Sequence, residues 1–170
     1  MKKYIIAFSG SHGVGKSTDV FRKAYELKLE TPEKKIGICT ENVVFNPFPI
    51  NLTATKEGQL WIFTNHINNE LEAISKYDIV VSDRSAVDSI AYTIVAGFPE
   101  IAKGMLSFVS EYIDIYRMIF FKKIRANNYY FNDGIRETTD NNYRERVEDV
   151  LLDLYEQLGI TKNQNRFVII

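Results

Sequence analysis

Gly10, Gly15, Lys16 and Ser17 have the residue types and the spacing that bind a polyphosphate chain. They meet the fixed positions of the pattern G-x-x-x-x-G-K-[ST], which directly follows the short apolar run 4–8. Glycines let successive backbone N–H groups turn toward an anion, which residues with a side chain rarely permit. The lysine brings a positive charge to the β- and γ-phosphates, and the serine hydroxyl is placed to hold Mg²⁺. The pattern therefore predicts that the chain binds a nucleoside triphosphate.

The residues expected to line this nucleotide site form one continuous segment: Ser11, His12, Gly13, Val14, Gly15, Lys16, Ser17 and Thr18. The helix predicted to follow the segment adds the positive end of its dipole to the attraction for phosphate. An ordinary glycine-rich turn between a strand and a helix is the alternative interpretation. It requires that every fixed position of the pattern match by chance.

Five short apolar runs predict the strands that position this loop, at residues 4–8, 35–40, 77–82, 118–122 and 166–170. The runs are rich in Ile and Val and continuous rather than alternating, which is typical of parallel strands covered on both faces. Helical patterns lie between them, at about 15–29, 55–75, 101–115 and 143–158. This alternation predicts an α/β fold: a five-stranded parallel sheet with helices on both faces, in a single domain over residues 1–170.

Apolar spacings of three and four predict which face each helix buries. In the helix at 55–75 they select Leu60, Phe63, Ile67, Leu71 and Ile74, and they leave His66 near the polar side. In the next helix they select Ile101, Met105, Phe108, Tyr112 and Ile115. In the last helix they select Tyr143, Val147, Val150, Leu151, Leu154 and Leu158, with Asp140 as candidate N-cap and Gly159 just past the end.

Polar residues at the strand ends are the next candidates, because ligands of such sheets bind beyond the carboxyl ends of the strands. Strand 35–40 leads into Glu41, and strand 77–82 leads into Asp83 and Arg84. Asp83 is expected to make the second Mg²⁺ contact, and an N-cap role for the segment from Ser85 is its alternative. The planar fork of Arg84 suits a phosphate or the acceptor, and a surface ion pair is the alternative.

These segments together resemble the P-loop nucleoside and nucleotide kinases. The resemblance rests, in chain order, on Gly10–Ser17, Val80–Ser85, Val87–Tyr92, Asp133–Arg136 and the pair Tyr143-Arg144. The pattern is nearest to the group that contains nicotinamide-riboside kinases, with deoxynucleoside and thymidylate kinases more distant. The resemblance spans nearly the whole chain, although only the phosphate loop is specific on its own. It implies the P-loop NTPase fold, with ATP and Mg²⁺ as cofactors.

The resemblance also implies roles for residues of the acceptor site. Glu41 matches the carboxylate that takes the proton of the acceptor hydroxyl, and Gln59 matches the glutamine that reads the acceptor's base. Arg84 matches the arginine of an acidic-Arg-Ser motif, in which Asp83 stands where the deoxynucleoside kinases have Glu. Thymidylate kinases have Asp-Arg, so the substrate class stays open. A solvated Glu41 and a surface position for Gln59 are the alternatives.

Residues 126–142 are polar and are expected to form a lid over the nucleotide. Kinases of this architecture place arginines in such a lid, because the transferred phosphoryl group carries charge on its equatorial oxygens. Arg136 is therefore the lid candidate for catalysis, with Arg144 and Arg146 behind it. The alternative for the last two is a solvated helix face, with a weak pair between Arg144 and Glu148.

Aromatic residues follow the second predicted strand. Phe45 and Phe48 lie in a Pro-rich segment that cannot continue a sheet, beside the expected acceptor site. They either stack on a flat ring of the acceptor or fill a core under the loop, and the core is the favoured interpretation. The same choice applies to Trp61.

Composition bounds the partners and the compartment. The 170 residues carry a formal net charge of −1, which gives no general attraction to nucleic acid or to acidic membranes. The single cysteine, Cys39, cannot form an internal disulfide, and the short apolar start before Ser9 does not suit a secretory signal. A cytoplasmic protein with no membrane partner is expected, and a homodimer stays open.

The sequence as a whole predicts an ATP- and Mg²⁺-dependent kinase that acts on a nucleoside or a (deoxy)nucleoside monophosphate. A nicotinamide-riboside-type kinase is the alternative. A nucleic-acid 5′-kinase is disfavoured because no basic stripe is evident. A nucleotide-driven switch protein requires a base-reading element such as Asn-Lys-x-Asp after the fourth strand, where the chain has Lys122-Lys-Ile-Arg125.

Overall fold

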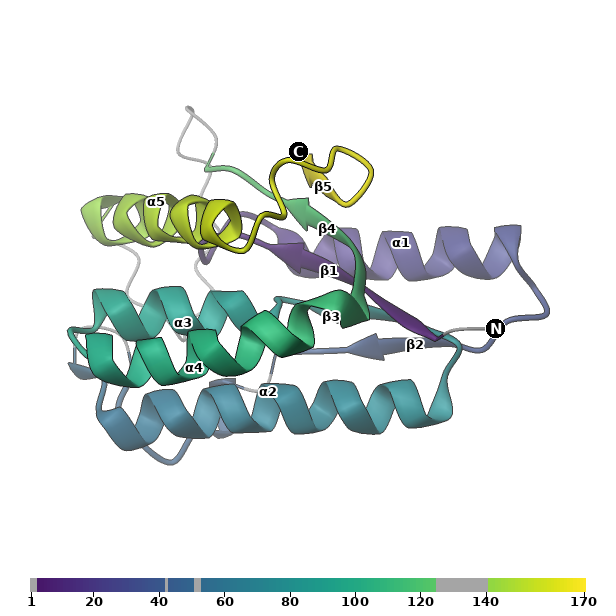
Figure 1. The fold of residues 1–170 in the computed structure, drawn as a ribbon. Coiled ribbons are helices and arrows are strands. Elements are labelled where there is room, and N and C mark those ends of the chain that lie inside the picture. The colour runs from purple at the N-terminus through teal and green to yellow at the C-terminus, as the bar shows by residue number, and fades with distance from the viewer. Residues whose placement is uncertain (1–2, 42, 51–52, 125–140) are drawn as a thin grey trace.

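The computed structural model describes residues 3–41, 43–50, 53–124 and 141–170. Five parallel strands form one sheet in the order β2-β3-β1-β4-β5 (Figure 1). The strands are β1 (Tyr4–Ser9), β2 (Ile36–Cys39), β3 (Ile79–Asp83), β4 (Tyr116–Phe121) and β5 (Phe167–Ile169). All five fall on the predicted apolar runs.

The helices are α1 (Lys16–Glu30), α2 (Lys56–Lys76), α3 (Ala86–Val95), α4 (Pro99–Tyr112) and α5 (Asn141–Gln157). Short 3₁₀ turns stand at Val43–Phe45 and Ile113–Ile115. No helix in the described ranges is long and apolar enough to cross a membrane. The predicted lid segment 126–140, with Arg136 and the candidate cap Asp140, lies outside the described residues, and residues 141 and 142 already belong to α5.

Helices cover both faces of the sheet, as predicted. α1 packs Val20, Ala24 and Leu27 against β1 and β3 on one face. The second and larger core lies on the other face and includes side chains of α2, α3, α4 and α5. Figure 1 shows this arrangement, with α1 behind the sheet and the other helices stacked in front.

The predicted buried face is confirmed for α5 and only partly correct for α2 and α4. Tyr143, Val147, Leu151 and Leu154 of α5 are buried. In α2, however, Leu60 and Leu71 are exposed, whereas the polar residues Gln59, His66 and Glu70 are buried beside Phe63 and Ile67. In α4, Phe108 is exposed, and Ala102, Met105 and Val109 face the core.

A buried hydrogen-bond network explains the inward rotation of α2. The Glu70 carboxylate accepts hydrogen bonds from the hydroxyls of Tyr112 and Tyr116 at 3.2 and 2.8 Å, and it pairs with His66 at 3.1 Å. The Tyr116 hydroxyl in turn accepts the backbone N–H of Ala86 at the start of α3. These bonds satisfy polar groups that would otherwise be costly to bury.

The strand register brings the predicted site residues to one edge of the sheet. Phe8 of β1 pairs with Asp83 of β3, and Cys39 of β2 pairs with Ser82 of β3. The three strands therefore end side by side. The segments that leave them carry the phosphate loop, Glu41 and Arg84.

Candidate active site

Residues 10–15 form a turn from β1 into α1 with the backbone that the pattern predicts. Gly10, Gly13 and Gly15 have φ angles of 140°, 69° and 82°, which residues with a Cβ rarely adopt. At Gly10 a Cβ would also overlap the carbonyl oxygen of Lys122. The turn borders a hollow of about 260 Å³.

The hollow is lined by His12, Gly13, Gly15, Lys16, Ser17, Thr18, Glu41, Asp83 and Arg84. Lys16 is buried, and its Nζ donates to the carbonyl oxygen of Ser11 across the loop at 2.6 Å. This bond holds the ammonium group over the turn. Most of the predicted nucleotide-binding residues thus surround one space.

Ser17 and Asp83 meet at the floor of the hollow, where the hydroxyl donates to Asp83 Oδ2 at 2.5 Å. A hydroxyl and a carboxylate are hard oxygen ligands, and Mg²⁺ takes few protein ligands because it keeps waters and substrate phosphates. Within the described ranges no group of three or more His, Cys, Asp or Glu side chains could hold a metal. The pair therefore fits Mg²⁺ brought in with a nucleotide, and it does not fit a resident metal.

Asp83 is not the N-cap of α3, so that alternative is wrong. The cap is Ser85, whose hydroxyl accepts the backbone N–H of Val87 at 3.2 Å. Asp88 completes the cap, since its Oδ2 accepts the backbone N–H of Ser85 at 2.9 Å. Asp83 is left to face the hollow.

Arg84 contacts residues from several parts of the site. Its φ angle of 87° is the one positive value among non-glycine residues of the described chain, a conformation that costs about 1–3 kcal/mol. Arg84 is 6% exposed, and its guanidinium lies 2.7 Å from Glu41 Oε1 and 3.4 Å from Asp88 Oδ1. It also lies over the Tyr92 ring, 5.1 Å from the centroid. Arg84 is thus a buried ion-pair partner, and the surface alternative is wrong.

The charges around Arg84 keep it ionised. Burial alone would lower the pKa of the guanidinium, but Tyr92 and the carboxylates of Asp88 and Asp83 raise it above its usual value. Burial also raises the pKa of the Tyr92 phenol, so that ring is neutral at physiological pH. The attraction between Arg84 and Tyr92 is therefore that of a cation over a neutral ring.

Asp88 is a site residue that sequence reasoning did not single out. Its Oδ1 accepts the backbone N–H of Gly10 at 3.2 Å and faces Arg84 Nη1, so one carboxylate ties the phosphate loop to the arginine. The available signal was the Ser85-x-x-Asp88 spacing of a capping box. Such a spacing predicts a helix start and gives no hint of the second contact.

A cleft beside the hollow has two lobes that share Glu41, Val43, Ile62, Arg84 and Ser89. The first lobe adds Ile50, Gln59, Tyr92 and Tyr143, and the second adds Trp61, Asn65, His66 and Asn69. Their volumes are about 30 and 20 Å³, enough for about one or two water molecules each. A larger ligand therefore enters only when the lining side chains move apart.

The structure contradicts the surface positions considered for three residues of this cleft. Gln59 is buried in the first lobe, where its Oε1 accepts the Thr93 hydroxyl at 3.3 Å, so the surface alternative is wrong. His66 is also buried rather than on the surface, because Glu70 holds it from inside. Glu41 is half-buried by its pair with Arg84 and not simply solvated.

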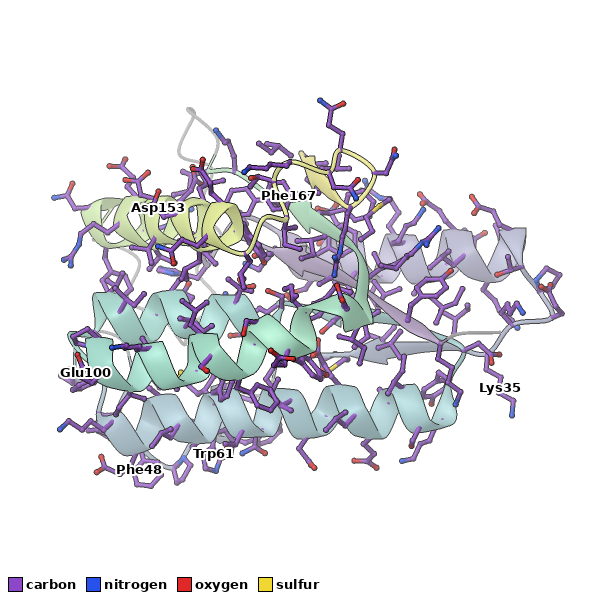
Figure 2. All side chains as sticks on the ribbon, viewed as in Figure 1. Lys35, Phe48, Trp61, Glu100, Asp153 and Phe167 are labelled. Atoms are coloured by element: carbon purple, nitrogen blue, oxygen red, sulfur yellow. The ribbon has the colours of Figure 1, made fainter. Side chains whose placement is uncertain are left out.

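The aromatic residues of the loop do not form a core. Phe45 is 72% exposed and Phe48 is 38% exposed, so the favoured core interpretation is wrong for both. Trp61 is half-buried and lines the second lobe. Figure 2 labels Phe48 and Trp61 beside the first turns of α2.

Basic residues beyond β3 support the loop rather than the cleft. Arg144 is buried, and its Nε donates to the carbonyl oxygen of His12 at 3.2 Å, whereas Arg146 is exposed. Glu148 Oε2 accepts the backbone N–H of Ile124 at 2.7 Å. Lys122 pairs with Asp19 and donates to the carbonyl oxygen of Gly15. Arg144 and Lys122 thus fix the loop backbone from two sides.

No protein-family model matches the chain, and no curated protein does either. Solved structures do match. A thymidylate kinase from Ehrlichia chaffeensis superposes with a TM-score of 0.66 at 20% identity, over 100% of this chain and 87% of that one. NadR protein in complex with NR superposes with a TM-score of 0.76 at 16% identity, over 98% of this chain and 45% of that one. NadR in complex with NAD and AMP-PNP gives a TM-score of 0.72 at 15% identity, over 98% and 44%.

This chain has the P-loop kinase fold. The predicted fold class and the predicted resemblance are both confirmed at the level of structure. The chain spans about half the length of NadR. Within the P-loop kinase fold, the hollow and the cleft described above occupy adjacent positions at the carboxyl edge of the sheet.

Proposed function

We propose that the protein transfers the γ-phosphoryl group of ATP, with Mg²⁺, to a nucleoside or a (deoxy)nucleoside monophosphate. One observation carries this proposal: Glu41 and Arg84 line both the phosphate hollow and the two lobes of the cleft. An acceptor atom held at this pair lies between the two ligands. That placement is what direct transfer between bound substrates requires.

In the proposed reaction the acceptor oxygen forms a bond to the γ-phosphorus. The bond from that phosphorus to the β,γ-bridging oxygen breaks, and ADP leaves. Where the acceptor is a hydroxyl, its proton passes to the carboxylate of Glu41. Lys16 offsets charge on the β- and γ-phosphates, and backbone N–H groups of the loop bind their oxygens.

Ser17 and Asp83 are the residues that would hold Mg²⁺. The metal, when bound with the nucleotide, supplies positive charge to the phosphate oxygens. Arg84 keeps Glu41 in place through their 2.7 Å contact. Asp88 contacts both Arg84 and the backbone N–H of Gly10, and so fixes the arginine relative to the loop. The proposed role of Arg136 in the lid stays a prediction.

The test is ADP release from Mg-ATP with a panel of nucleosides, their 5′-monophosphates and nicotinamide riboside, with products identified by mass spectrometry. We expect at least one acceptor to raise ADP release well above background and to gain one phosphoryl group. Lys16→Ala should lower the rate by about 100-fold or more, because it removes the charge at the transferring group. Lys23→Ala, a change on the outer part of the same helix, is the matched control and should turn over normally.

Two outcomes would contradict the proposal. One is a wild-type rate in the Lys16→Ala variant. The other is ADP release that no small molecule stimulates, which would favour a nucleotide-driven switch, or which only a 5′-hydroxyl oligonucleotide stimulates, which would favour a nucleic-acid kinase.

A further inference from the structure

We infer that the acceptor carries no phosphate: the cleft is built for a neutral or cationic molecule with a free hydroxyl, such as a nucleoside, and against its monophosphate. The inference rests on the proposed function and narrows it. It is carried by the charges that surround Arg84 and by the chemistry that each kind of acceptor needs at that position.

Positive charge is scarce in the cleft. Among the described residues that line either lobe, Arg84 is the one lysine or arginine. The other ionisable cation, His66, is paired with the buried carboxylate of Glu70. The remaining lining groups are apolar, amide, hydroxyl or phenol, apart from Glu41. A phosphate in this cleft would depend on Arg84.

Arg84 is already engaged at Nε, at Nη1 and across the plane of its guanidinium. Glu41 faces its Nε, and Asp88 and the Gly10 carbonyl oxygen face its Nη1, while the Tyr92 ring covers its plane. One positive and two negative groups leave this cluster with a net charge of −1. A phosphate monoester carries about −1.5 to −2 at neutral pH, so it meets repulsion rather than a free guanidinium.

The two classes of acceptor also need opposite groups at the point of transfer. A phosphate oxygen is already ionised at neutral pH, so it needs cations and gains nothing from a base. A hydroxyl is a hydrogen-bond donor that must lose a proton, so it needs a carboxylate within reach. Glu41, half-buried and held at 2.7 Å from Arg84, supplies the carboxylate. The arrangement matches a hydroxyl.

The experiment compares each nucleoside with its own 5′-monophosphate, in binding and in turnover. The pairs are thymidine, cytidine, adenosine and nicotinamide riboside against their monophosphates. Binding is measured by calorimetry in saturating Mg-AMP-PNP, so that the loop itself is occupied. For the acceptor that binds most tightly, we expect the phosphate-free form to bind roughly 100-fold more tightly than the monophosphate, and to be the better substrate by a similar factor in kcat/KM.

Glu41→Gln separates this inference from a general defect. The change removes one negative charge and the base together, so turnover of the nucleoside should fall about 100-fold, while the binding preference against the monophosphate should shrink at least tenfold. Glu72→Gln is the control, because Glu72 is an exposed carboxylate outside the cleft, paired with Lys76 on α2. It should keep the wild-type preference.

Equal or tighter binding of the monophosphates would overturn the inference, and so would an unchanged preference in Glu41→Gln. Preferred binding of a nucleoside without any phosphoryl transfer would uphold the inference about the cleft and refute the proposed kinase activity. Transfer to monophosphates alone would do the reverse.

Discussion

Four residues of the site have positive φ angles: Gly10, Gly13, Gly15 and Arg84. The three glycines had a sequence signal, whereas Arg84 had none. Gly10 has a φ of 140°, and its place in the glycine pattern predicted such freedom. Arg84 has a φ of 87°, and the presence of an arginine in a sequence gives no reason to expect a positive φ. Tertiary contacts impose it: the backbone N–H of Arg84 donates to Phe8 at 2.9 Å, and carboxylates hold its guanidinium.

Substitution at Gly10 tests how tightly the loop is built against β4. In Gly10→Ala the new Cβ would overlap the Lys122 backbone, so we expect a loss of about 3 kcal/mol or more in the free energy of unfolding. Gly97→Ala is the matched control, because Gly97 also has a positive φ of 88° but has no atom within 4 Å of the added Cβ. It should lose only about 1 kcal/mol. Denaturant unfolding measures both, and equal losses would contradict the contact with Lys122.

At the scale of elements, apolar patterns predicted the strands and the buried face of α5 but not that of α2. A short continuous apolar run predicts a strand directly, because a strand that is buried on both faces has no polar face for the pattern to identify. α2 buries Gln59 and Glu70 because partners on α3, α4 and β4 satisfy them, and it buries His66 because Glu70 pairs with it on the same helix. A hydropathy pattern gives no information about such partners, and it therefore left His66 near the polar side of the helix.

The His66–Glu70 pair makes stability depend on pH in a defined direction. Burial lowers the pKa of His66, but the charge and hydrogen bond of Glu70 and the charge of Asp88 outweigh burial and the charge of Arg84, so the folded pKa is raised above 6.5. A raised pKa contributes stability that is complete below the unfolded value and is lost as pH rises through the folded value.

Comparison of wild type with His66→Gln tests that direction. The difference in the free energy of unfolding should be largest near pH 6 and should shrink as pH rises through the folded pKa of His66. Denaturant titrations at a series of pH values measure it, with Glu72→Gln as a variant whose difference from wild type should stay flat over the same range. A constant difference for His66→Gln would show that the fold leaves the pKa of His66 unchanged, and a difference that grows with pH would show that the fold lowers it; either result would contradict the predicted direction.

At the scale of the whole molecule, the strand order determines which residues meet at the site, and composition does not predict this. The sheet order places β1 between β3 and β4, and β2 beside β3, so the ends of three strands converge. The sequence predicted that polar strand ends would meet, since the strands were expected to be parallel. It did not predict that Glu41 and Arg84 would form one ion pair between two ligand spaces. A net charge of −1 over 170 residues likewise says nothing of the local charge around Arg84.

Direct titration of Mg-ATP into the protein by calorimetry tests the central claim, that residues 10–17 are a cradle for polyphosphate. The account predicts saturable binding at one site in wild type and affinity about 100-fold weaker, or none, in Lys16→Ala. No saturable binding of Mg-ATP or Mg-GTP, or equal affinity in the two proteins, would contradict it.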